Sequence, residues 1–66
     1  MITIKERLEQ GLPVIGVMVR ALQFFNVFHG KIVKTADEPE MYVAEGRDLF
    51  GDITVKGYPW QFEVIE

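Results

Sequence analysis

The sequence predicts a fold of the α+β class: a short amino-terminal helix, a long and mostly buried helix, and then a four-stranded antiparallel sheet. Three observations lead to this prediction. A helix-capping pattern opens the chain, polar residues recur every third position in its apolar middle, and apolar and polar residues alternate in its second half. Because 66 residues suffice for one hydrophobic core, we expect a single domain over residues 1–66.

The first helix is expected over residues 4–10. Thr3 and Glu6 stand three residues apart, which is the spacing of a capping box at the amino terminus of a helix. Gly11 then favours the left-handed backbone conformation in which many helices end. Pro13 suits the first turn of a second helix, because its missing N–H would have no partner there in any case.

Residues 13–29 are compatible with two structures. Four β-branched residues favour a strand, namely Val14, Ile15, Val17 and Val19. Arg20, Gln23 and Asn26 favour a helix, because a spacing of three gathers side chains on one helical face but divides them between the faces of a strand. We therefore expect a helix over residues 13–29 that is buried on most of its circumference. The alternative is a small β-barrel with one amino-terminal helix, opened by a strand over residues 14–19.

The second half of the chain predicts four short strands, over residues 31–36, 41–45, 52–56 and 60–64. Glycine, proline and acidic residues fill the segments between them, as is typical of turns. Ile53 and Val55 share one face of the third strand. In the last strand Trp60, Phe62 and Val64 share a face, so we expect all three to build the core beneath the long helix.

Composition and charge restrict the possible functions. Hydrophobic residues make up 48% of the chain, and this surplus indicates an exposed apolar surface for self-association or for a partner. The formal net charge of −3 disfavours nucleic-acid binding over the whole surface. The amino terminus is charged where a secretory signal would be apolar, and the apolar residues 12–28 are at the short limit for a bilayer span. We therefore expect a soluble, cytoplasmic protein that does not bind membranes.

The residue types that most enzymes need are scarce. The chain contains no serine and no cysteine, so the two commonest nucleophiles and the thiolate metal ligands are missing. His29 is the single histidine. At the carboxyl end of the expected long helix, the helix dipole would stabilise its imidazolium form. No spacing of carboxylates matches a calcium-binding loop. We therefore expect no catalysis, no metal site and no cofactor.

Acidic and aromatic residues of the expected turns form the candidate partner-binding site. The set is Asp37, Glu38, Glu40, Arg47, Asp48, Phe50 and Tyr58. Aromatic residues carry much of the energy of protein interfaces, and acidic side chains speed the encounter with a basic partner. The sequence thus predicts a non-enzymatic domain that occludes or bridges a partner protein. A phage-type inhibitor of a host defence or nucleic-acid-processing enzyme is one setting that its size and acidity suit.

Two other functions stay open. A structural homo-oligomer, such as a homodimer, would pack through the long apolar helices of two copies. A small nucleic-acid-binding β-domain would instead stack bases on the aromatic residues Tyr58, Trp60 and Phe62, with lysines on the neighbouring strands. The negative net charge makes nucleic acid the less favoured partner of the two, and we rank both behind the binding of a foreign protein.

Overall fold

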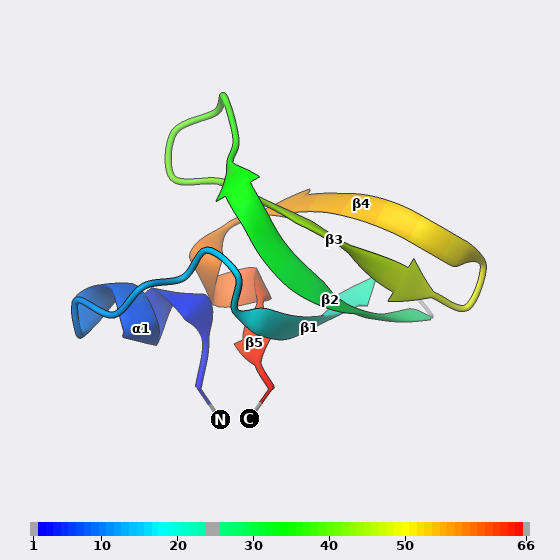
Figure 1. Ribbon diagram of the computed structural model, residues 1–66, viewed down its shortest axis with the longest axis horizontal. Helices are drawn as coiled ribbons and strands as arrows, with labels where there is room; N and C mark the ends of the chain where they lie inside the picture. Colours follow the sequence, from blue (N-terminus) through cyan, green and yellow to red (C-terminus); the bar gives the residue numbers. More distant parts are fainter. Residues whose placement is uncertain (1, 24–25, 66) are drawn as a thin grey trace.

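The protein is an antiparallel β-sheet with one short helix, as the computed structural model shows for residues 2–23 and 26–65 (Figure 1). The elements follow in the order α1 (Ile4–Glu9), β1 (Met18–Gln23), β2 (Asn26–Thr35), β3 (Tyr42–Asp48), β4 (Gly51–Gly57), the 3₁₀ turn η1 (Pro59–Gln61) and β5 (Glu63–Val64). The predicted α+β arrangement around a long buried helix is therefore wrong. The sheet has five strands, and the α-helix that stands beside it has six residues.

Helix α1 begins at the predicted residue and ends one residue earlier than expected. Its cap is Thr3, whose Oγ1 accepts a hydrogen bond from the backbone N–H of Glu6 at 3.4 Å. Gly11 follows the helix with a φ of 74°, a conformation that glycine adopts without the steric cost of a Cβ. Ile4 is fully buried, so the first turn of the helix is attached to the core of the sheet.

The long helix predicted over residues 13–29 is not found in the described part of this segment. The segment contains β1 and the start of β2, which pair as a hairpin from Met18 opposite Lys31 to Gln23 opposite Asn26. Residues 24 and 25, between the strands, lie outside the described residues. The position of β1 is set by this pairing and by burial of its inner face, neither of which a local spacing of polar residues reports.

Arg20, one of the three polar residues whose spacing favoured a helix, lies on a strand instead. Val19 and Ala21 face the core, and Arg20 between them lies on the outer face, where its guanidinium donates a hydrogen bond to Glu63 at 2.7 Å. The side chains of Gln23 and Asn26 are not among those described. The alternative strand over residues 14–19 is misplaced as well, because residues 15 and 16 form a turn. Within residues 2–23 and 26–65, hydrogen bonds do not close the sheet into a barrel, since β4 and β5 are its two edges.

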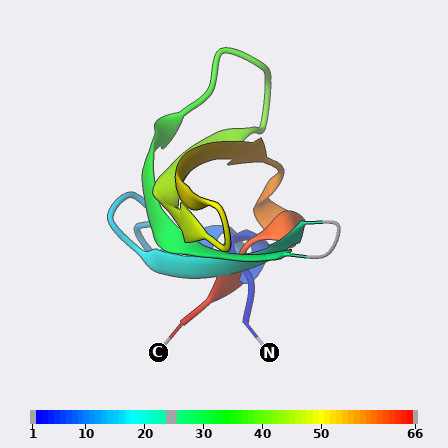
Figure 2. The ribbon, with the colours of Figure 1, turned by 90° about the vertical axis from the view of Figure 1, so that its right-hand side faces the viewer.

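The strands are ordered β4-β3-β2-β1-β5, and each neighbouring pair is antiparallel. Strands β1 to β4 follow one another as hairpins, and β5 returns to pair with β1. The sheet curls strongly, so that β3 and β4 arch over β1 and β5 when the molecule is viewed from its end (Figure 2). The core consists of Ile4, Val14, Val19, Ala21, Phe28, Ile32, Ala44, Val55 and Phe62.

Two glycines oppose each other where β2 pairs with β3. Gly30 lies directly across from Gly46 in the ladder. A Cβ on Gly30 would lie 2.5 Å from the ring of Phe28, and a Cβ on Gly46 would lie 2.8 Å from the carbonyl carbon of His29. Both positions therefore exclude a side chain. Their lack of one leaves room for the ring of Phe28 and for the close approach of the two backbones.

The two edges of the sheet differ. Strand β5 has two residues, and the amino-terminal segment covers its outer side. The N–H of Ile4 donates to the carbonyl oxygen of Phe62 at 3.0 Å, and the N–H of Val64 donates to that of Ile2 at 2.7 Å. Strand β4 is seven residues long, and within residues 2–23 and 26–65 it pairs with β3 alone. An edge of this length offers backbone N–H and C=O groups to another strand.

Candidate functional site

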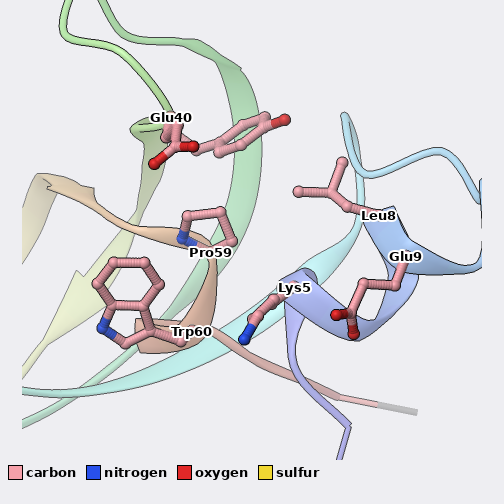
Figure 3. A pocket seen from close by; sticks show the side chains of 7 residues that line it. Lys5, Leu8, Glu9, Glu40, Pro59 and Trp60 are labelled. Atoms are coloured by element: carbon pink, nitrogen blue, oxygen red, sulfur yellow. The ribbon is translucent and has the colours of Figure 1, made fainter.

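A groove of about 370 Å³ lies between α1, the start of β3 and η1 (Figure 3). Its apolar walls come from Leu8 of α1, Tyr42 of β3, and Pro59 and Trp60 of η1. Figure 3 shows Pro59 and Trp60 on one side and Leu8 on the other, so the turn and the helix form opposite walls. Clefts of this kind, with aromatic lining and a few charged groups, are the usual form of binding sites.

Pro59 gives this wall its shape. Proline fixes φ near the value of a first helical turn, so the chain makes one 3₁₀ turn here instead of entering a strand directly. The side-chain Oε1 of Gln61 accepts a hydrogen bond from the backbone N–H of Tyr58 at 2.7 Å and fixes the start of the turn. Pro59 is buried by this arrangement, whereas the next residue, Trp60, is 57% exposed.

Two aromatic rings stack beside the groove. The rings of Tyr58 and Trp60 are nearly parallel, with planes 3° apart and centroids separated by 4.6 Å. Stacked pairs contribute about 0.5–1.5 kcal/mol beyond the area that they bury, so the stack favours this orientation of the indole. The prediction that Trp60 joins Phe62 and Val64 in the core is therefore wrong. Phe62 is fully buried and Val64 half-buried, but η1 turns the tryptophan outward.

Three charged residues stand around the apolar walls. Lys5 and Glu9 belong to α1, and Glu40 belongs to the turn that precedes β3. Figure 3 shows Glu40 and Glu9 on different sides of the groove. Glu40 has a φ of 66°, in the left-handed region, which costs a residue other than glycine about 1–2 kcal/mol. Such strain is often retained where a binding site requires it.

The candidate residues taken from the sequence form two groups at opposite ends of β3 (Figure 1). The turn between β2 and β3 holds Asp37, Glu38 and Glu40, and Tyr58 follows β4 at the same end of the sheet. The other end, at the β3–β4 hairpin, holds Arg47, Asp48 and Phe50. Strand β3 runs between the two ends, and its seven residues, the last two of which are Arg47 and Asp48, span about 20 Å at the rise of an extended chain. Only Glu40 lines the groove, and Tyr58 adjoins it through the stack with Trp60.

The first group includes an ion pair. The ammonium of Lys56 donates a hydrogen bond to Oε1 of Glu38 at 2.8 Å and lies 2.6 Å from Oε2. This hydrogen bond, supported by the opposite charge, lowers the pKa of Glu38 below its ordinary value. Both side chains are about half exposed, so the pair contributes little to the free energy of folding. It does fix the Glu38 carboxylate against β4.

The second group forms a hairpin tip with exposed apolar side chains. The carboxylate of Asp48 accepts a hydrogen bond from the N–H of Phe50 at 2.7 Å, and Phe50 is 87% exposed. Arg47 lies 3.2 Å from Asp52 across the hairpin. His29, which was expected at a helix end, lies in β2 opposite Arg47, so its predicted role at a helix dipole is wrong.

The sequence matches no protein-family model, and no curated protein or solved structure matches it significantly. Function must therefore be argued from the site itself. No group of three or more potential metal-ligating side chains occurs among the described residues. Nor does any helix in the described ranges have the length and apolarity to cross a membrane.

Sequence reasoning missed the main residues of the groove. Trp60 was assigned to the core, and Leu8, Tyr42 and Pro59 were given no role in a site. The one local signal for this arrangement is the proline immediately before the tryptophan, because proline is disfavoured inside a strand. The opposing wall depends on the packing of α1 beside η1, which no pattern in the sequence reports.

Proposed function

We propose that this chain is a non-enzymatic protein-binding domain that receives an extended segment of a partner protein in the groove between α1 and η1. Occlusion or bridging of the partner follows from that contact. The observation that carries the proposal is the exposed indole of Trp60, held against Tyr58 beside apolar walls. Tryptophan and tyrosine are the residues whose truncation most often costs an interface its affinity.

The wall of the groove around Trp60 is preorganised for binding. The stack with Tyr58 and the buried Pro59 already restrict Trp60, so a partner loses little side-chain entropy on ordering it. A narrow apolar trough between a helix and a turn suits an extended segment with apolar side chains, as aromatic grooves suit polyproline II peptides.

The charges around the groove favour a partner segment that is basic. Glu9 and Glu40 line it, Asp37 and Glu38 lie in the adjoining turn, and the whole chain carries −3. Lys5 offers the opposite charge and would orient the segment by its own pairing. Complementary charge of this kind speeds encounter and fixes register more than it adds affinity. A cytoplasmic setting is part of the proposal, because a cysteine-free chain is suited to a reducing compartment.

The test is selection of peptides from a displayed random library on the immobilised protein, followed by calorimetric titration of the selected peptides. We expect peptides with apolar and basic residues, and quenching of Trp60, the single tryptophan, on binding. Trp60→Ala should weaken binding at least tenfold, or about 1.4 kcal/mol. Phe50→Ala is the matched control, because it removes an exposed aromatic ring at the far end of β3.

Three results would contradict the proposal. The first is a library from which no peptide is enriched over the Trp60→Ala variant. The second is equal loss of affinity in Phe50→Ala, which would remove the groove from the binding site. The third is stronger quenching of Trp60 by a single-stranded oligonucleotide than by any selected peptide, which would favour base stacking.

A further inference from the structure

Edge strand β4, which pairs with β3 alone among the described residues, has a sequence that complements itself. It reads Gly51-Asp52-Ile53-Thr54-Val55-Lys56-Gly57, with Thr54 at its centre. Residues at equal distances from Thr54 form favourable pairs: glycine with glycine, β-branched Ile53 with β-branched Val55, and acidic Asp52 with basic Lys56. Two copies of such a strand, placed side by side in opposite directions, would pair every residue with a suitable neighbour.

We propose that two copies of this protein form a symmetric dimer by antiparallel pairing of their β4 strands around Thr54. Thr54 then lies opposite Thr54 of the second copy, and Asp52 lies opposite Lys56 of the second copy on the same face. The threonine pair and the opposite-charge pairs are both favourable cross-strand combinations. The sheets of the two copies become continuous across the twofold axis, and the backbone groups of both β4 edges gain partners.

The charges that already flank β4 extend this complementarity. Within one copy, Arg47 lies 3.2 Å from Asp52, and Lys56 contacts Glu38 at 2.6 Å. Pairing of the two edges would place these ion pairs in one row that alternates in sign: Arg47 and Asp52 of one copy, then Lys56 and Glu38 of the other. The twofold axis generates a second, identical row. If the register shifted by one residue, the charged side chains of one copy would lie on the same face as the apolar side chains of the other, and both rows of alternating charge would be lost.

The other edge of the sheet explains why the assembly would stop at two copies. The outer side of β5 is covered by the amino-terminal segment, through the bridge between Thr3 and Glu63 and its two flanking hydrogen bonds. A head-to-tail chain needs two different accessible edges on each copy. Pairing of one edge with itself is closed and gives a dimer. Among the described residues, β4 has a ladder partner on one side only, which is β3. No residue that lines the groove belongs to β4, so the dimer does not depend on the proposed function.

Sedimentation equilibrium of the intact chain at low ionic strength, up to millimolar concentration, tests the dimer. Asp52→Lys and Lys56→Asp each place like charges opposite each other at two positions, so each variant alone should dimerise about tenfold to hundredfold more weakly than the wild type. Mixed in equal amounts, the two variants restore both opposite-charge pairs and should form a heterodimer. Circular dichroism of each variant confirms that it is folded.

Recovery of the dimer on mixing is the decisive result. If the substitutions had only destabilised the fold, mixing two destabilised variants would not restore the dimer. The reference variant is Lys34→Glu, which reverses an exposed charge on β2, outside the proposed contact. A wild-type protein that stays monomeric at millimolar concentration overturns the proposal. So does a dimer that persists unchanged in both charge variants, since it would lie on another surface, and so do two monomeric variants that fail to associate when mixed.

Discussion

Replacement of Gly46 by alanine tests whether the curled sheet depends on the opposed glycines of β2 and β3. A Cβ at this position would meet the carbonyl group of His29 and the Cα of Gly30 on the neighbouring strand. These atoms belong to the backbone of a hydrogen-bonded ladder, so they cannot move aside as the end of a flexible side chain does. The ladder itself must separate or shift to admit the methyl group.

The expected loss is large for a protein of this size. Insertion of a group into a packed site costs about 1–3 kcal/mol. Because the added methyl group meets backbone atoms, we expect Gly46→Ala to lower the free energy of unfolding by about 3 kcal/mol. A chain of 66 residues has a total stability of about 3–10 kcal/mol at 0.05–0.15 kcal/mol per residue. The substitution therefore removes about a third of the stability or more. The corresponding fall in melting temperature is about 12–24 °C.

Urea unfolding followed by far-ultraviolet circular dichroism measures this loss, with Gly57→Ala as the matched control. A Cβ on Gly57 would lie 2.9 Å from Oε1 of Gln61 and 3.3 Å from the ring of Phe62, and both are side chains. Small shifts relieve these contacts, so we expect a loss of about 1 kcal/mol. If Gly46→Ala is no more destabilising than Gly57→Ala, the stability of the sheet does not depend on the close approach of β2 and β3.

Two further substitutions concern the turn between β2 and β3. Lys56→Gln should lower the free energy of unfolding slightly at neutral pH, and the difference from the wild type should shrink as the pH falls below 4.5. Because the pKa of Glu38 is lowered in the folded protein, the ion pair stabilises the fold at pH values above the ordinary pKa of glutamate, and this stabilisation is lost as the carboxylate protonates. A stability difference between variant and wild type that stays constant into acid would contradict this. Glu40→Gly should be about 1 kcal/mol more stable than Glu40→Ala in urea unfolding, because the φ of 66° strains alanine but not glycine. Equal stabilities of the two variants would show that the backbone conformation at Glu40 is not strained.

Local signals in the sequence located the elements whose causes are local. The cap formed by Thr3 and Glu6 placed α1, and turn residues separated the strands of the second half, although β3 continues three residues beyond its predicted end and β5 is only Glu63–Val64. The segment from residue 13 to residue 29 was predicted wrongly because its structure depends on partners far along the chain. Arg20 lies on an outer face because Val19 and Ala21 on either side of it are buried, and β5 brings Glu63 beside it. Neither helix propensity nor polar spacing contains that information.

The groove was missed for a related reason. Trp60, Phe62 and Val64 alternate as a buried strand requires, and the rule holds for Phe62, which is fully buried. It fails at Trp60 because Pro59 starts a 3₁₀ turn, which changes the direction of the side chain without changing the spacing in the sequence. A large aromatic ring that the local pattern assigns to the core, but that the backbone turns out into solvent, leaves apolar surface exposed at a thermodynamic cost. Proteins tend to depart from local rules at functional positions. The failure of the alternation at Trp60 is thus itself an argument that this wall of the groove serves binding.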